Sequence, residues 1–199
     1  MTVKTKEKDK IYAKLKKEDL DFKIEIATQT LDRNIGFITS CDNKTSIVLA
    51  SFGALLAIIF TNEGLNKVFN ILKACIAIKT ICNMFYLICF SGSIFLMGLG
   101  MFNLGSVLVA KISDGAVAKR DGQSCLFFVG IRKSGDCKTY SQRFYEMSKE
   151  DFLNDLIEQI YINADIASVK YTTYNIGLRR TIIGFILFIV LLLIGIYVY

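Results

Sequence analysis

Apolar residues along the chain fall into long uncharged runs and into stretches where they recur every three or four residues. The run from Thr181 to Tyr199 has no charged residue and is long enough to cross roughly 30 Å of bilayer hydrocarbon as a helix. The run 80–110 is also uncharged and exceeds the length of one span, which predicts a helix that is tilted or extends out of the bilayer. A shorter uncharged run covers 45–61. The pattern predicts three transmembrane helices.

A periodic stretch lies before the first of these runs. Its apolar residues are separated by three or four positions, which is typical of one face of an amphipathic helix. They are Leu20, Ile24, Ala27, Leu31, Ile35 and Ile38. Residues 1–17, ahead of this stretch, are rich in lysine.

A second periodic stretch precedes the last uncharged run. Ser148 can cap a helix there, and Glu150 and Asp151 occupy its first turn, where the helix dipole favours negative charge. Its apolar residues alternate spacings of four and three, a pattern that predicts a coiled-coil seam. They are Leu153, Ile157, Ile160, Ala164, Ala167, Tyr171, Tyr174 and Leu178. Nothing breaks the helix before Thr181, so the seam and the third span are expected to form one rod.

The two periodic stretches can pack on each other as a cytoplasmic helical stalk. A stalk joined rigidly to membrane helices would transmit motion to them, but a seam specifies association and not motion. A stalk that serves packing alone therefore fits the periodicity equally well.

The connection after the first span leaves two alternatives open. Apolar residues from Leu65 to Ile76 have helical spacing, typical of an interfacial helix on the outer face or of the first turns of the long second helix. A four-span arrangement would break 68–110 near "FSGS". It would bury Lys73 and Lys79 in or near the bilayer, at about 2.5–3.5 kcal/mol each at the centre, so three spans are favoured.

Residues 111–147 form the only stretch without helical periodicity. Turn signals (SDG, RDG, KSGD) surround the short apolar run "CLFFVGI". This run fits a strand, with "KTYSQRF" returning to make a small β-hairpin, or a buried extended segment.

Positive charge sets the expected orientation. Of the 24 Lys and Arg residues, ten lie in 1–44, three in 62–80 and eleven in 111–180. Because positively charged loops stay in the cytoplasm, the N-terminus is expected inside and the C-terminus outside.

The expected fold is an all-α membrane protein with a small non-helical insert. Its predicted segments are 1–44, a basic head with an amphipathic helix; 45–110, two spans with a short external connection; 111–180, the insert and coiled-coil-like helix; and 181–199, the third span.

Composition argues against an enzyme. The chain is 53% hydrophobic and contains no histidine, and it lacks the Walker, GxSxG and HExxH motifs. The acid pairs Asp151/Asp155 and Asp155/Glu158 are expected on a solvated helix face. The six cysteines, without histidine or a CxxC pair, argue against zinc. Cys125 and Cys137, placed in a reducing cytoplasm, are expected as free thiols. Cys75, Cys82 and Cys89 recur every seven residues, as on one helical face.

Two basic groups are candidates for binding an anionic ligand. The first is "CDNK", in which Lys44 precedes the first span. The second combines Lys119, Arg120, Arg132, Lys133 and Lys138 with Lys170 on the last helix. Phosphate binding favours such residues, yet snorkelling and the positive-inside rule would place them there as well.

Three segments occur in the order "DNKTSIVLASFGALLAI", "LFFVGI" and "EDFLNDLIEQIYINADIASVKYTTYNIGLRR". Taken together, they resemble the Pycsar transmembrane effector family of bacterial antiphage defence, and the similarity covers roughly residues 20–199. Its most specific residues are Asp155, Gln159, Ile160, Ile166, Ala167, Lys170 and Tyr171, together with Asp42 and Lys44.

The resemblance implies a multi-pass protein of the bacterial inner membrane, encoded beside a nucleotide cyclase. Such a protein would respond to a cyclic nucleotide by oligomer rearrangement and membrane disruption, without a cofactor or a nucleic acid polymer as partner. The expected ligand contacts are Lys44, Arg132, Lys133 and Lys170. The competing hypothesis is a structural scaffold whose stalk recruits a cytoplasmic partner. The sequence does not choose the nucleotide, the stoichiometry, or a pore over general disruption.

Overall fold

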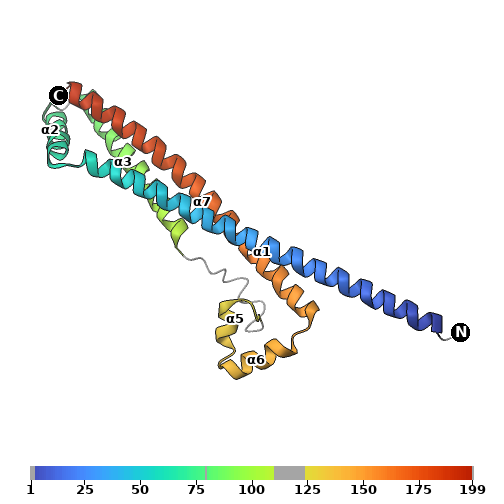
Figure 1. Ribbon diagram of the computed structural model, residues 1–199. Coiled ribbons are helices and arrows are strands. Elements are labelled where there is room, and N and C mark those ends of the chain that lie inside the picture. The colour runs from blue at the N-terminus through green and yellow to red at the C-terminus, as the bar shows by residue number, and fades with distance from the viewer. Residues whose placement is uncertain (1–2, 79, 110–123, 199) are drawn as a thin grey trace. The chain divides into compact units, whose positions relative to one another are not determined.

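A computed structural model describes residues 3–78, 80–109 and 124–198, with side chains from Glu18 onward. Helices and turns account for the described residues, and none of these forms a strand (Figure 1). The helices are α1 (Val3–Ile59), α2 (Asn62–Ile78), α3 (Ile81–Leu108), α5 (Phe128–Lys133), α6 (Cys137–Glu146) and α7 (Lys149–Val198). The expectation of an all-α membrane protein is confirmed.

Three of these helices are long and apolar enough to cross a membrane, among the residues that the structure describes. They are Glu18–Ile59, Ile81–Leu108 and Lys149–Val198. Each of the three helices covers one predicted span (45–61, 80–110 and 181–199) except for one or two residues at an end of the span. The break near "FSGS" that a fourth span requires is wrong, because α3 continues through Phe90–Ser93.

The connection after the first span forms a separate helix. Thr80 has an extended backbone conformation ahead of α3 (φ −82°, ψ 150°), so α2 is not the first part of a longer second helix. The expected common face of Cys75, Cys82 and Cys89 is therefore wrong, since Cys75 lies on α2 and the other two on α3. All six cysteines are free thiols.

The hairpin expected in the insert is also wrong. The residues "FVGIRK" form α5, and "CKTYSQRFYE" form α6. The signal "KSGD" between them marks two helix ends instead of a strand turn. Gly135 adopts a positive φ of 87°, which favours glycine and ends helices, and the side chain of Asp136 caps α6 by accepting the N–H of Thr139.

The chain divides into two compact units. Unit 1 comprises residues 1–39 and 111–168, and unit 2 comprises 40–110 and 169–199. Helices α1 and α7 each contribute residues to both units.

Within unit 1, α1 packs against α7 along the predicted N-terminal stripe. Ala27 is buried, and Leu20, Ile24 and Leu31 are half-buried. The Asn34 side chain donates a hydrogen bond of 3.2 Å to the Ile160 carbonyl across the two helices. The N-terminal stripe therefore finds a partner on α7 in part, since Ile35, another of its members, is 46% exposed.

The stripe predicted on α7 is not the buried face in unit 1. Ile157 is 52% exposed and Ala164 is exposed, although Ala167 is buried. The buried residues are Asp155, Leu156, Gln159, Ile162 and Ala167. A pattern built on apolar residues alone misses this face because two of its members are polar side chains.

Unit 2 is held together by close approaches between α3 and α7. A Cβ added at Gly100 would lie 2.4 Å from the Thr181 backbone nitrogen, and one at Gly184 would lie 2.5 Å from that of Met97. Phe188 fills the centre, fully buried, with its ring centroid 5.4 Å from that of Phe90. Small residues that let helix backbones approach in this way are typical of membrane helix packing.

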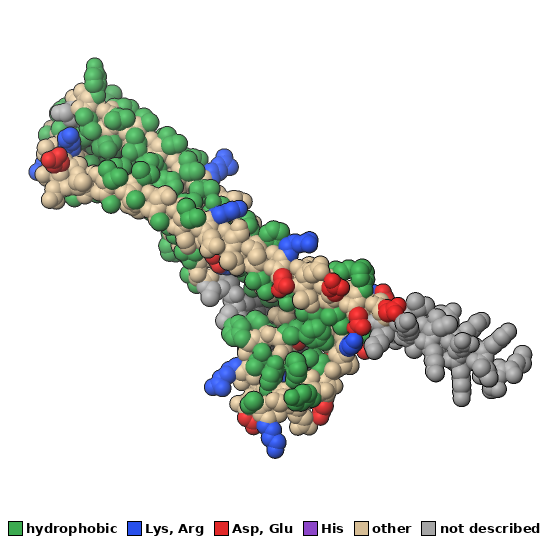
Figure 2. Space-filling model, viewed as in Figure 1, with side chains coloured by type: hydrophobic (Ala, Val, Ile, Leu, Met, Phe, Trp, Pro, Cys, Tyr) green, Lys and Arg blue, Asp and Glu red, His purple; other side chains and the backbone are tan. Residues whose placement is uncertain are grey.

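The outer surface of unit 2 is mainly apolar. Figure 2 shows hydrophobic side chains spread over this part of the molecule with few charged ones. Exposed residues include Ile47, Ile58, Phe95, Phe102 and Leu193. A surface of this kind suits lipid chains as its solvent.

Candidate functional site

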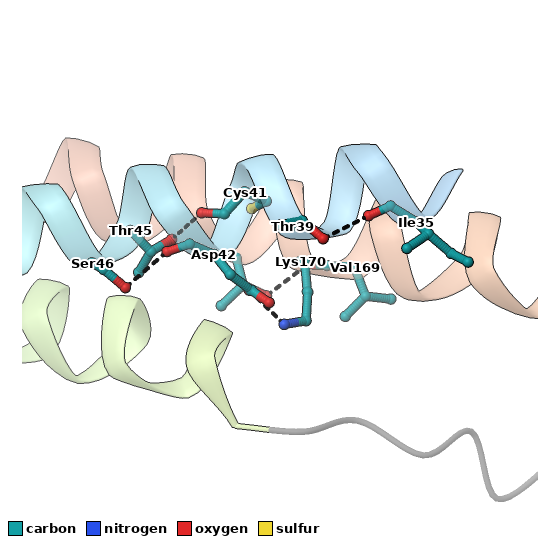
Figure 3. Close-up of polar contacts among 9 residues, drawn as sticks. Ile35, Thr39, Cys41, Asp42, Thr45, Ser46, Val169 and Lys170 are labelled. Atoms are coloured by element: carbon teal, nitrogen blue, oxygen red, sulfur yellow. Dashed lines mark hydrogen bonds and ion pairs between the residues drawn. The ribbon is translucent and has the colours of Figure 1, made fainter. Parts of the chain in front are cut away.

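A buried ion pair joins α1 to α7 inside unit 2. The Lys170 ammonium lies 2.6 Å from the Asp42 carboxylate, as a donor to its Oδ1 atom (Figure 3). Lys170 is only 4% exposed, and Asp42 is half-buried. Among the salt bridges given for the described residues, this one has the most buried cation.

The surroundings of the pair are small and closely packed. Cys41 and Thr45, on either side of Asp42 along α1, are fully buried. The Thr45 hydroxyl donates to the Cys41 carbonyl at 2.8 Å, so this buried polar side chain has a partner within α1. Removing one partner from a buried pair leaves an uncompensated charge and costs about 3–5 kcal/mol. The pair therefore fixes α1 against α7.

A second charged contact lies beside it. The Lys44 ammonium lies 6.0 Å from the centre of the Tyr171 ring, at the limit of a cation–π contact. Lys44 is exposed and Tyr171 is half-buried. Asp42 and Lys44 on α1 and Lys170 and Tyr171 on α7, all predicted from the sequence to matter, thus form one group, here called the Asp42–Lys170 cluster.

A buried carboxylate organises a turn in unit 1. The Asp155 Oδ1 atom accepts the Ser124 hydroxyl at 2.8 Å, and Oδ2 accepts the N–H groups of Cys125 at 2.9 Å and Leu126 at 3.3 Å. The Ser124 hydroxyl oxygen in turn accepts the N–H of Phe127 at 2.9 Å. We call Asp155 and residues 124–127 the Asp155 turn.

The expectation of a solvated acid face at Asp155 is wrong. Asp155 is 5% exposed and Gln159, one turn further along α7, is 6% exposed. Its carboxylate is satisfied by the backbone N–H groups of Cys125 and Leu126 and by the Ser124 hydroxyl, and Ser124 was not among the residues predicted from the sequence. Asp155, Gln159 and Ile162 are separated by four and three positions, which places the two polar side chains on the same helix face as an apolar one. This spacing was the signal in the sequence that Asp155 is buried.

Residues of α6 line two pockets in unit 1. One of about 360 Å³ is lined by Arg143, Glu146, Asp151 and residues of the Asp155 turn. Another of about 260 Å³ contains Arg132 with Asp136, Cys137 and Tyr140. The Thr139 N–H that Asp136 accepts lowers the pKa of that carboxyl below its ordinary value.

The sequence-predicted cations are divided between the two units. Arg132 and Lys133 occupy the last turn of α5 and Lys138 the second position of α6, all in unit 1. Lys44 and Lys170 belong to unit 2. Lys119 and Arg120 lie outside the described residues. Among the described residues, no group of three or more Cys, Asp and Glu is arranged to hold a metal ion.

Comparison with known proteins places these features in a family. Residues 26–196 match the family described as the Pycsar effector protein domain. The Pycsar effector protein GmPycTM of Gulbenkiania mobilis is 31% identical over 182 residues, covering 84% of this chain and 90% of the relative. The Pycsar effector protein EcPycTM of Escherichia coli is 27% identical over 155 residues, covering 77% and 80%. No solved structure matches the chain.

Proposed function

The chain belongs to the Pycsar effector family, and from this premise we propose that it is a membrane effector activated by a cyclic nucleotide. The observation that carries the proposal is the family match over 26–196, which includes the Asp42–Lys170 cluster, the Asp155 turn and the greater part of each membrane-length helix. The chain is a transmembrane effector of antiphage defence. Its proposed action is to disrupt the membrane and stop growth once a cyclase has made the messenger.

The proposed location is the bacterial inner membrane, with the N-terminus in the cytoplasm. Three apolar helices support insertion. The ten Lys and Arg residues in 1–44 and the eleven in 111–180 support the orientation, because positive charge is retained inside. In this orientation unit 1 faces the compartment in which the messenger is made.

The proposed mechanism uses the continuity of α1 and α7. Both helices contribute to unit 1, and both contribute one member of the Asp42–Lys170 pair to unit 2. A ligand can shift such a protein only by binding one state more tightly than another. We expect the messenger to change the packing of α1 on α7, and an oligomer to rearrange as a result.

The charged residues receive different roles in this proposal. Lys44, Arg132 and Lys133 remain candidates for contact with the ligand phosphate, since each is exposed. Lys170 is buried against Asp42, which supports a role in holding the two helices together. The effector is proposed to act without catalysis, through packing and charge.

Expression in bacteria tests the proposal most directly. The protein alone should leave growth unchanged, and the protein with its cyclase should stop growth. Purified protein in liposomes should release a trapped dye when one compound is added from a panel of cyclic CMP, UMP, AMP and GMP and cyclic di- and trinucleotides. A structural scaffold would be indifferent to the cyclase and would leave the liposomes sealed.

The ion pair is tested by reversing its charges. Lys170→Glu should abolish activation while membrane insertion is retained, because it leaves two carboxylates facing each other. The double variant Asp42→Lys with Lys170→Asp should recover part of the activity, since it restores the pair in the opposite sense. Arg33→Glu, a charge reversal at an exposed site on α1, is the matched control. Unchanged toxicity in Lys170→Glu would exclude the pair from signalling.

A further inference from the structure

A third cavity in unit 1 lies where α1, α6 and α7 meet. Its volume is about 380 Å³, within the range of roughly 300–1,000 Å³ found for small-molecule pockets. It is lined by Asp21, Ile24, Phe144, Met147, Ser148, Lys149 and Phe152. Apolar side chains supply most of the wall. Figure 2 shows further apolar side chains exposed among charged ones over the part of unit 1 that contains α5 and α6.

The charged groups of this cavity form an exchangeable pair. The Lys149 ammonium donates to the Asp21 carboxylate and links the start of α7 to α1. The two side chains are 52% and 49% exposed. Ion pairs this open to water contribute little to stability, so another anion can replace the carboxylate at small cost. The Ser148 hydroxyl is already engaged by the Asp151 carboxylate and backbone N–H.

We propose that this cavity binds the messenger, with the nucleobase against Phe144 and Phe152 and the phosphate on Lys149 in place of Asp21. This inference rests on the proposed function and deepens it by assigning a site. Flat bases stack on aromatic side chains with little dependence on sequence, and a lysine ammonium is a compact partner for a phosphate. The cavity has one cation to bind one phosphate and one apolar wall to stack one base, which matches a mononucleotide.

The other two pockets of unit 1 suit an anion less well. The pocket of about 360 Å³ carries the carboxylates of Glu146, Asp151 and Asp155 beside Arg143. The pocket of about 260 Å³ contains the Asp136 carboxylate, which caps α6, as well as Arg132. Like charges at close range oppose the binding of a phosphate.

Occupation of the cavity would replace one charged contact between α1 and α7. In the ligand-free protein Lys149 holds Asp21, and in the complex it would hold the phosphate. Asp21 is therefore a competitor of the ligand as well as a contact of α1. Loss of Asp21 should strengthen ligand binding, whereas loss of Lys149 should weaken it. A residue pair with a purely structural role would give the same sign for both changes.

Equilibrium binding to purified full-length protein in detergent tests the site. The probes are cyclic CMP, UMP, AMP and GMP and cyclic di- and trinucleotides, each measured by calorimetry. For the compound that binds, Lys149→Gln should raise the Kd at least tenfold, Lys149→Arg should preserve most of the affinity, and Asp21→Asn should lower the Kd severalfold. Arg33→Gln, which removes an exposed cation on α1, should leave the Kd unchanged.

Three results would overturn the assignment. They are an unchanged Kd in Lys149→Gln, a weakened affinity in Asp21→Asn, and no binding of any probe by the folded wild type. Growth with and without the cyclase is measured in parallel and decides the proposed function separately. Growth arrest together with an unchanged Kd in Lys149→Gln would leave the effector function standing and move the site elsewhere.

Discussion

The carboxylate of Asp155 accepts one hydroxyl and two backbone N–H groups, and this is why an acidic side chain can be buried on α7. Sequence reasoning could assign Asp155 to a helix, but it could not see the turn at 124–127 that folds against it. The Asp42–Lys170 pair presents the same difficulty. Both residues were singled out from the sequence, yet their contact joins positions 128 residues apart, and helical periodicity does not report such contacts.

Replacing Asp155 should destabilise unit 1. Asp155→Ala leaves the Ser124 hydroxyl and the N–H groups of Cys125 and Leu126 without their acceptor, at a cost of about 2–3 kcal/mol. Thermal unfolding of the purified protein in detergent, followed by circular dichroism, measures the loss. Asp165→Ala removes an exposed carboxylate from the same helix and serves as the control. Equal melting of the two variants would show that the Asp155 turn contributes no stability.

The cap of α6 should respond to acid. The pKa of Asp136 is lowered because its carboxylate accepts the Thr139 N–H, so the cap stabilises α6 fully above the ordinary value of about 3.9. That stability is lost as the pH falls through the lowered pKa of the folded protein. Asp136→Asn keeps an acceptor at this position but does not titrate.

Hydrogen exchange over Cys137–Glu146 checks the cap by comparing the two proteins at the same pH. Their protection should agree at neutral pH. At acidic pH the wild type should lose protection relative to Asp136→Asn. If the two proteins stay alike down to the lowest pH at which they remain folded, the carboxylate is not what holds the start of α6.

At the scale of the helices, periodicity predicted which face of α1 packs on α7, but it predicted the wrong buried face for α7 in unit 1. The stripe on α1 is apolar, and the structure buries Ala27 on it with Leu20, Ile24 and Leu31 partly covered. The inner face of α7 in unit 1 mixes Asp155 and Gln159 with apolar residues, so a count of apolar positions favoured a neighbouring face.

The prediction of a β-hairpin in the insert was wrong for a related reason. A glycine and an aspartate between two short segments mark a hairpin turn or the ends of two helices, and local sequence does not distinguish them.

Helix packing in unit 2 should depend on Gly100 and be indifferent to Gly98. A Cβ at Gly100 would meet the Thr181 backbone nitrogen at 2.4 Å, whereas nothing lies within 4 Å of one at Gly98. Gly100→Ala should force α3 away from α7 and cost about 1–3 kcal/mol, the usual penalty for overpacking. Gly98→Ala, two positions away on the same helix, should melt like the wild type or slightly above it. The prediction fails if the two variants melt together.

For the whole molecule, the three spans and the helical class followed from the sequence because the uncharged runs are long. The arrangement within unit 2 did not follow, since any apolar face of a membrane helix can meet either lipid or another helix. A glycine marks a face that packs on another helix only where the backbone of that helix lies close to it. Gly100 and Gly184 contact α7 and α3 respectively, while Gly92 and Gly105 meet nothing within 4 Å.

The distribution of charge leads to a prediction for the membrane topology of the whole chain. The connection 62–80 carries three lysines against ten Lys and Arg residues in 1–44, so α2 should lie on the outer face and the C-terminus should emerge there after the third span. Alkaline phosphatase, which folds only outside the cytoplasm, should be active when fused after Tyr199 and inactive when fused before Met1. A green fluorescent protein that folds only inside should give the reverse. Active phosphatase at the N-terminus would invert the topology and place the Lys149 cavity away from any messenger made in the cell.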